Sequence, residues 1–366
     1  MAATYLPSEV NQLIVKYTKY SVKLLTSIWS DDDLTDFYKN YKLDVKYLEL
    51  KLVFLKYQDH TKFKKLSNVN DIKYIHNGLH TLKFGQKFNQ PVVLPNSLRA
   101  INFGSCFNQP VVLSENLHFI TTGYYFNQPV VLPNSLNIVN FGWEFNQPVV
   151  LPENLHYVNF GCNFNQPVVL PENLHSITFG WSFNQPVVLP NSLRAIGFGS
   201  SFNQPVVLPE NLHSITFEWK FNQPIVLPNS LRIIKFGWDF NQPVVLPDNL
   251  HSVTFGSDFN QPVVLPENLH SVEFGCHFNQ PVVLPDSLRT VEFGSNFDQP
   301  VVLPKNLHSI TFGSEFDQPV VLPENLHSVA FGLFFYQPVM LPENLRDIKF
   351  NKNNLEKVGN QLIFKN

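Results

Sequence analysis

The side chains best suited to chemistry in this sequence are histidines that recur in one sequence context. Each follows an Asn-Leu pair, and a column of imidazoles about 5 Å apart could ligate a metal ion or respond to pH. The segment that contains each histidine recurs along the chain, and in some of these copies arginine replaces the histidine, for example Arg194, Arg232 and Arg289. A fixed cation is a poor neighbour for a metal ion. We therefore expect a solvated or half-buried structural column that holds no metal and no cofactor. The histidines are His118, His156, His175, His213, His251, His270, His308 and His327.

Other chemistry is not indicated by the sequence. The three cysteines, Cys106, Cys162 and Cys276, lie in copies too far apart to pair, so we expect no disulfide framework and a reducing compartment. There is no Gly-rich phosphate loop, no His-Glu-x-x-His and no Gly-x-Ser-x-Gly. An enzyme needs a few singular polar residues in one pocket, whereas this sequence repeats the same ones. We predict that the protein is not an enzyme.

The element that must position these residues is a repeat of constant length. The string Phe-Asn-Gln-Pro, or a close variant of it, begins at Phe88 and recurs every 19 residues up to Phe335, without insertion or deletion. Fourteen copies therefore span residues 88–353, and we number positions 1 to 19 from this Phe. The repeat accounts for most of the 34 Phe and 28 Pro of the 366-residue chain, because both types occupy fixed positions in it.

One copy, Phe240–Asp258, predicts the local structure of all. Val253 and Phe255 alternate with polar residues, which is the pattern of a short strand with one buried face. Gly256, at position 17, suggests a turn that needs positive φ, and Pro-Val-Val-Leu-Pro must run extended because it contains two prolines. So short a segment cannot bury its own Phe, Val and Leu, but stacked copies can. We predict a mainly β fold, a single-stack β-solenoid of fourteen turns around one hydrophobic spine.

Position 2 predicts a column of buried amides. This position holds Asn in every copy from the one with Asn89 to the one with Asn279, and the last three copies have Asp298, Asp317 and Tyr336 there. Stacked amides can pass hydrogen bonds along the axis, each worth about 1 kcal/mol net. Because ionised Asp cannot donate and adjacent Asp residues repel, we predict that the last three copies are the least stable.

The ends differ from the array. Residues 66–87 keep the register in degraded form and read as a capping repeat, and residues 354–366 read as the cap of the other end. Residues 1–65 are poor in proline and place Val10, Leu13, Ile14 and Tyr17 at helical spacing, so we expect a small helical head. Residues 1–87 carry a net charge of +5 and the remainder −8.

The repeat resembles that of the FNIP-repeat proteins of social amoebae and of giant viruses of amoebae. The resemblance rests on Phe-Asn-x-Pro, as in Phe145–Pro148, followed by Leu-Pro-x-x-Leu-x-x-Ile-x-Phe, and it covers about three-quarters of the chain. FNIP repeats are related to leucine-rich repeats, which implies a leucine-rich-like solenoid. A copy of 19 residues leaves no room for a helix on the outer face.

The beginning of the chain resembles the start of an F-box. Leu6-Pro7-Ser8-Glu9-Val10 followed by Leu13 and Ile14 matches the usual Leu-Pro-x-Glu-Ile opening, although the basic-Trp ending of that motif is missing. FNIP proteins with an N-terminal F-box exist, and the resemblance implies a substrate receptor of a Skp1–cullin ubiquitin ligase. In that interpretation the adaptor would contact Leu6, Pro7, Glu9, Val10, Leu13 and Ile14. The alternative is that Pro7 starts a helix and the head is a helical cap.

Positions 13, 15, 18 and 19 vary while the rest of the copy stays fixed, and position 18 collects aromatic residues. Exposed aromatics next to charges are typical of protein interfaces. The alternative is that each ring packs over the neighbouring turn. The residues concerned are Tyr124, Trp143, Trp181, Trp219 and Trp238, with Tyr125 at position 19.

These observations favour a non-enzymatic scaffold that binds a protein partner through the variable edge of the solenoid. The alternative is the F-box-like receptor with a Skp1-like adaptor. A net charge of −3 does not favour nucleic acid or anionic membranes as partners, and the apolar stretch 47–57 is too short to span a bilayer. No secretory signal is visible. We expect a cytoplasmic monomer, in the host-cell cytoplasm if the protein is viral.

Overall fold

The computed structural model describes residues 79–350 and 355–364. The predicted helical head at 1–65, with all of the predicted adaptor-contact residues, and the first part of the predicted capping repeat lie outside these ranges. The chain forms two compact units, one up to Phe164 and one from Asn165 onward. Both are built from the same 19-residue turn, and we describe them in order.

The N-terminal unit contains five short parallel strands, one per turn. Each pairs with the next at an offset of 19 residues, for example Ile101 with Ile120 and Val139 with Val158. The first strand lies in the predicted capping repeat and continues the same register, pairing Leu82 with Ile101. The strands are β1 (Thr81–Lys83), β2 (Ala100–Asn102), β3 (Phe119–Thr121), β4 (Ile138–Asn140) and β5 (Tyr157–Asn159).

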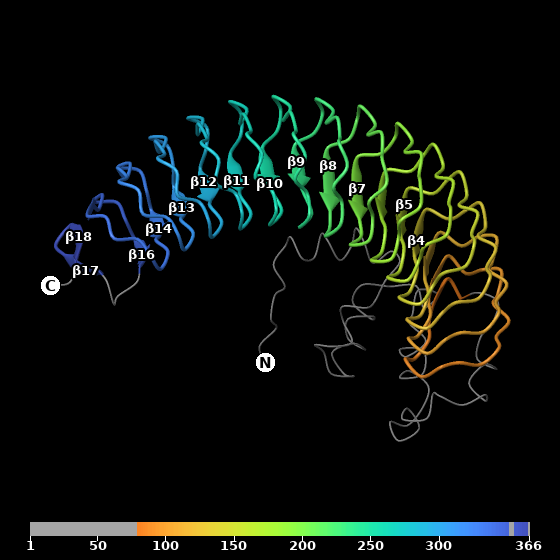
Figure 1. Ribbon diagram of the computed structural model, residues 1–366. Helices are drawn as coiled ribbons and strands as arrows, with labels where there is room; N and C mark the ends of the chain where they lie inside the picture. Colours follow the sequence, from red (N-terminus) through yellow and green to blue (C-terminus); the bar gives the residue numbers. More distant parts are fainter. Residues whose placement is uncertain (1–78, 351–354, 365–366) are drawn as a thin grey trace, which may run out of the picture. The chain divides into compact units, whose positions relative to one another are not determined.

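The C-terminal unit has the same arrangement with ten parallel strands and ends in a hairpin, and Figure 1 shows β7 to β14 lying side by side. Its parallel strands are β6 (Ser176–Thr178), β7 (Ala195–Phe198), β8 (Ser214–Phe217), β9 (Ile233–Lys235), β10 (Ser252–Thr254), β11 (Ser271–Glu273), β12 (Thr290–Glu292), β13 (Ser309–Thr311), β14 (Ser328–Ala330) and β16 (Asp347–Lys349). A separate antiparallel sheet is made of β15 (Val339–Met340), β17 (Leu355–Val358) and β18 (Gln361–Phe364).

Two tight turns give each coil its shape. At one corner the Phe240 N–H donates to the Gly237 carbonyl at 3.2 Å, and at the other the Leu250 N–H donates to the Pro247 carbonyl at 3.0 Å. The strand joins the corners on one side and the Pro-Val-Val-Leu-Pro segment on the other. The described residues contain no helix, so the prediction of a parallel β-solenoid with 19-residue turns is confirmed.

Phenylalanines from positions 1 and 16 form the hydrophobic spine. The ring centroids of Phe236 and Phe240 are 4.0 Å apart within one turn, and those of Phe240 and Phe259 are 6.1 Å apart in adjacent turns, with nearly parallel planes. All three side chains are buried, and the Leu of position 11 and the Val or Ile of position 14 complete the core. Each turn therefore buries its apolar residues against its neighbours, as predicted from the length of the repeat.

The glycine column has a different cause from the predicted one. Among the described glycines only Gly359, in the β17–β18 turn, has positive φ. At Gly256 a Cβ would instead overlap the carbonyl oxygen of Gly237 in the preceding turn, and the same overlap occurs at Gly275 and Gly294. Glycine is thus needed because successive backbones approach too closely for a side chain, and the prediction based on φ was wrong.

The asparagine column is a ladder of acceptors. Asn241 Oδ1 accepts hydrogen bonds from the Asn260 N–H at 3.0 Å and from Gln261 Nε2 at 3.1 Å in the next turn. Asp298 Oδ1 accepts the equivalent pair from Asp317 N–H and Gln318 Nε2. The column is half-buried rather than buried. Since the bonds use only the side-chain oxygen, the absence of a donor on Asp does not break the ladder, and that part of our stability argument was wrong.

Candidate functional site

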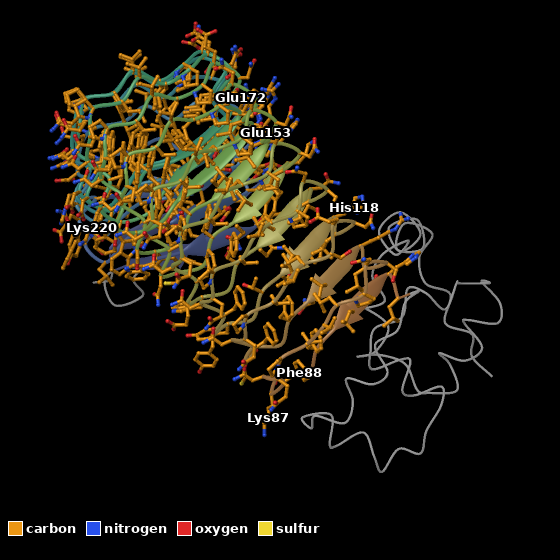
Figure 2. The ribbon with its side chains drawn as sticks, turned by 90° about the vertical axis from the view of Figure 1, so that its right-hand side faces the viewer. Lys87, Phe88, His118, Glu153, Glu172 and Lys220 are labelled. Carbon is orange, nitrogen blue, oxygen red and sulfur yellow. The ribbon has the colours of Figure 1, made fainter. Side chains whose placement is uncertain are left out.

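The histidine column lies along one edge of the turns and is anchored to the backbone. Nδ1 of His118 is 2.7 Å from the Asn116 carbonyl oxygen, and because a carbonyl only accepts, this nitrogen carries the hydrogen. Figure 2 shows His118 and Glu153 at one edge of the N-terminal unit and Lys87 and Phe88 at the opposite edge. The same contact recurs at His175, His213, His251, His270 and His308.

The two forms of the repeat, Asn-Leu-His and Ser-Leu-Arg, make different hydrogen bonds to the backbone of neighbouring turns. In the Asn-Leu-His form, Asn249 Nδ2 donates to the Asn229 carbonyl of the preceding turn. In the Ser-Leu-Arg form, Ser230 Oγ donates to the Leu212 carbonyl. Arg194 Nη1 reaches forward to the Asn211 carbonyl at 3.2 Å. Side chains at positions 10 and 12 thus both bind backbone carbonyls of their own or a neighbouring turn.

The described part of the chain holds no group of three or more His, Cys, Asp or Glu side chains placed to bind a metal ion. Adjacent imidazoles stack instead, with ring centroids 5.3 Å apart for His251 and His270. The three cysteines are free, as the spacing of their copies predicts. The described histidines of this column thus contact the backbone and, where two are adjacent, each other.

The edge at positions 17 to 19 carries the predicted aromatic residues. In the N-terminal unit, Tyr124 stacks on Trp143 with ring centroids 5.6 Å apart and meets Tyr125 edge-on at 4.7 Å. All three rings remain about half exposed. Desolvation by its surroundings, followed by the charge of the Glu144 carboxylate, raises the pKa of the Tyr124 hydroxyl above its ordinary value.

The C-terminal unit has a second aromatic cluster. The ring centroids of Trp181 and Trp219 are 5.3 Å apart although the residues lie two turns apart, because the intervening Ser200 is small and buried. Trp238 continues the row at 6.3 Å from Trp219. The backbone beneath is tied from turn to turn, since the Asp239 N–H donates to the Trp219 carbonyl at 2.8 Å. The cluster is therefore held on a rigid edge.

The six aromatic residues thus combine the two interpretations that the sequence left open. Each ring covers a neighbouring ring, yet the tryptophans remain 48–55% exposed, far from the burial of the spine phenylalanines. Their role in binding stays a prediction. The structure brings them together as two clusters, one in each unit: Tyr124, Tyr125 and Trp143, and Trp181, Trp219 and Trp238.

A hollow of about 370 Å³ lies on the exposed face of the parallel sheet over β6, β7 and β8. It exists because the residues that face outward there are small, with Ser176, Ala195 and Ser214 at position 13 and Thr178, Gly197 and Thr216 at position 15. Phe198 and Glu218 also line it. Glu218 occupies position 17 of its turn and directly precedes Trp219 in the sequence.

A second hollow of about 540 Å³ lies further along the same unit, over β11 to β14 and β16. Glu273 and Glu292 line it from adjacent strands, where the register places them directly opposite each other. Partial burial, and then the charge of Glu273, raises the pKa of Glu292. Lys349 lies on the same surface from β16.

Sequence reasoning missed an exposed apolar column. The second Val of each Pro-Val-Val-Leu-Pro segment is 86–88% exposed, for example Val245, whereas the Leu that follows it is buried, as Leu246 is. Alternation along an extended segment was the signal that could have revealed it, since neighbouring side chains point to opposite sides. Leu333 and Phe334 form another exposed apolar pair, at positions 18 and 19.

The fold and this surface define a leucine-rich-repeat-like β-solenoid. A solved structure described as CroV588, a novel circular LRR protein, is similar to 80% of this chain at 33% identity with a TM-score of 0.54, and this chain spans 59% of that protein's length. YopM from Yersinia enterocolitica WA-314 is similar over 74% of this chain and 73% of its own length, at 15% identity and a TM-score of 0.43. No curated protein matches the sequence.

The family follows from the repeat itself. The FNIP Repeat model matches over half of the chain, and the chain belongs to the FNIP-repeat family. The resemblance seen in the sequence is thereby confirmed. The matched segments are residues 126–163, 164–201, 202–239, 221–258, 240–277, 259–296 and 297–334. Among the described residues no helix is long and apolar enough to cross a membrane.

Proposed function

We propose that this protein is a non-enzymatic scaffold that binds a protein partner through the aromatic edge at positions 17 to 19. The observation that carries the proposal is the half-exposed row of Trp181, Trp219 and Trp238 on a scaffold whose other positions are nearly constant. Large rings held at low conformational entropy are the side chains that dominate binding energy in protein interfaces. The scaffold acts as a cytoplasmic monomer in this proposal.

Two features of the edge support a binding role. Its tryptophans are presented by backbone hydrogen bonds between turns, so that little ordering is needed when a partner binds. Charged residues lie beside the rings, with Lys220 after Trp219 and Asp239 after Trp238. Lys220 is labelled in Figure 2. Such a mixture of aromatic anchors and charges can provide both affinity and choice of partner.

Affinity capture from host-cell lysate with the full chain tests the proposal. We expect the double variant Trp181→Ser/Trp219→Ser to lose a partner that the wild type captures, while its thermal unfolding changes little. Val245→Ser, which removes an exposed apolar side chain from the Pro-Val-Val-Leu-Pro segment, is the matched control and should keep the partner. A partner retained by the tryptophan variant, or lost by the control alone, contradicts the assignment of the binding edge.

A second candidate function rests on the sequence at the beginning of the chain. Leu6-Pro7-Ser8-Glu9-Val10, with Leu13 and Ile14, resembles an F-box opening, and these residues lie outside the described part of the structure. In this proposal the head recruits a Skp1-like adaptor and the solenoid holds a substrate for ubiquitination. The aromatic edge would then be the substrate site.

Point variants of the full chain separate the two candidates. Leu6→Arg/Leu13→Arg should abolish co-purification of a Skp1-like protein and leave partners of the aromatic edge bound. Trp181→Ser/Trp219→Ser should have the opposite effect. If the wild type captures no Skp1-like protein, the receptor function is wrong and the scaffold function stands alone.

A further inference from the structure

Two residues of the C-terminal unit depart from the repeat in opposite senses, and both line the hollow over β6, β7 and β8. Position 17 is glycine in the neighbouring turns, at Gly199 and Gly237, but it is Glu218 in the turn between them. Position 15 carries a side chain at Thr178 and Thr216, but it is Gly197 in the turn between them. The two exceptions lie in successive turns.

Glu218 stands where the fold favours glycine. A Cβ at Gly199 or at Gly237 would overlap the backbone of the turn before it. The chain adapts at Glu218 by extending the sheet: β7 and β8 have four residues, Phe198 pairs with Phe217, and the Glu218 N–H donates to the Phe198 carbonyl at 3.2 Å. A residue that disturbs the close packing of a repeat, and that makes no contact which stabilises the fold in exchange, is expected at functional positions.

Gly197 stands where the fold accepts a side chain. A Cβ added there would meet only the Thr178 side chain, with Cγ2 at 3.4 Å, which is ordinary contact, and its φ is not positive. The scaffold therefore does not need this glycine. Its effect is to leave the middle of the hollow open between Thr178 and Thr216.

The chemistry of the hollow indicates what it could hold. Its walls are the small outward-facing residues Ser176, Ala195 and Ser214, with the hydroxyl-bearing Thr178 and Thr216, and Glu218 is the one carboxylate among the lining residues. The cations of the turns around the hollow include Lys220, Lys235, Arg194 and Arg232, and within the described ranges none of these four forms an ion pair with Glu218. A carboxylate at the rim of a small, hydroxyl-lined space complements a basic side chain.

We propose that this hollow receives an arginine or lysine side chain of the protein partner, which pairs with Glu218 while its chain lies across Trp181 and Trp219. This inference rests on the proposed function and names the chemistry that the partner must carry. The tryptophans supply contact area, and the Glu218 carboxylate favours partners that carry a basic side chain at this place. A partner with an acidic or apolar residue at this place would leave Glu218 unpaired.

Selection from a random peptide library displayed on phage, against the immobilised full chain, tests the inference. We expect the selected peptides to be enriched in Arg or Lys at one position. A synthetic copy of a selected peptide should bind Glu218→Gln about tenfold more weakly, which is the change expected for one charge-assisted hydrogen bond. Gly197→Thr, which fills the hollow with the residue of the adjacent turns, should weaken binding to a similar extent. Glu210→Gln, an exposed glutamate of the same turn, is the control and should bind normally.

Glu218→Gly separates binding from folding. This variant restores the glycine of the repeat, so its melting temperature should equal or exceed that of the wild type while peptide binding is lost. Failure to select any peptide whose binding depends on Glu218, or full binding by Gly197→Thr, overturns the inference. If peptides lose affinity for Trp181→Ser/Trp219→Ser but not for the Glu218 variants, the aromatic edge is still a binding site and only the basic residue is wrong. If no variant affects them, the proposed function fails as well.

Discussion

Gly256 lies directly over Gly237, so close that a Cβ on Gly256 would occupy the place of the Gly237 carbonyl oxygen. The φ of Gly256 is not positive, and the contact between turns is therefore the reason for the glycine. This relationship recurs through the glycine column. Successive turns therefore approach most of these glycines too closely for a side chain.

Replacing Gly256 with Ala should destabilise the protein by about 1–3 kcal/mol, because the added methyl forces two backbones apart. Gly197→Ala is the matched control, since its Cβ meets only ordinary contacts. That change should be neutral or stabilise by about 0.4–1 kcal/mol through the unfolded chain. Guanidinium unfolding of both variants measures the difference, and equal effects would contradict the steric explanation.

Truncation of the spine should have a larger effect. Phe240→Ala removes a fully buried ring that contacts Phe236, Phe221 and Phe259. We expect a loss of about 3–5 kcal/mol in the free energy of unfolding. Val245→Ala, at an exposed position five residues later, should change it by less than about 0.5 kcal/mol. A comparable loss at Val245 would mean that the valine column is covered in solution.

The asparagine ladder predicts that Asp is tolerated where Ala is not. Asn241→Asp keeps the oxygen that accepts from Asn260 N–H and Gln261 Nε2, whereas Asn241→Ala removes it. The alanine variant should lose about 1–3 kcal/mol, because a half-buried N–H is left without its acceptor. Amide hydrogen exchange at Asn260 should be faster in the alanine variant alone. Equal exchange in both variants would show that the ladder oxygen is dispensable.

The last turns keep the ladder but place two like charges in adjacent turns. Asp298 and Asp317 are linked by the Asp317 N–H to Asp298 Oδ1 bond at 3.0 Å. Repulsion between the carboxylates still favours lower stability there, so Asp317→Asn should stabilise by less than about 1 kcal/mol. Amide hydrogen exchange over residues 297–350 measures the local stability of these turns. Protection as high as in the middle of the C-terminal unit would contradict this expectation.

The paired glutamates of the second hollow predict a pH dependence. The folded state raises the pKa of Glu292 above its ordinary 4.5, so it binds the proton more tightly than the unfolded chain does. The stability from this group is fully present below pH 4.5 and lost as the pH rises through the raised pKa.

Glu292→Gln should therefore be more stable than wild type at pH 7, by less than about 1 kcal/mol because the site is partly exposed. The advantage should disappear near pH 4. Glu267→Gln, at an exposed position of the preceding turn, should show no such trend in thermal melts across this range. An advantage for Glu292→Gln that persists at pH 4 would contradict the raised pKa of Glu292 as its cause.

The order of residues along the chain determined the period, the register and the spine of this protein. A repeat of constant length places Phe240 over Phe221 and under Phe259, and no other stacking buries these rings, so the solenoid could be predicted from spacing alone. The aromatic residues at position 18 were found in the same way, because they stand out against constant neighbours.

Only the tertiary structure decided what depends on distances between turns and on the direction of side chains. It showed that close contact between backbones explains the glycines of the Gly256 column and that Val245 points outward. It also showed that the Asn241 column accepts hydrogen bonds through its side-chain oxygens. It also brought Gly197 and Glu218 to one hollow, although they are 21 residues apart and belong to different columns of the repeat. A linear pattern fixes which residues share a column, but the space between columns is set by how closely the turns pack.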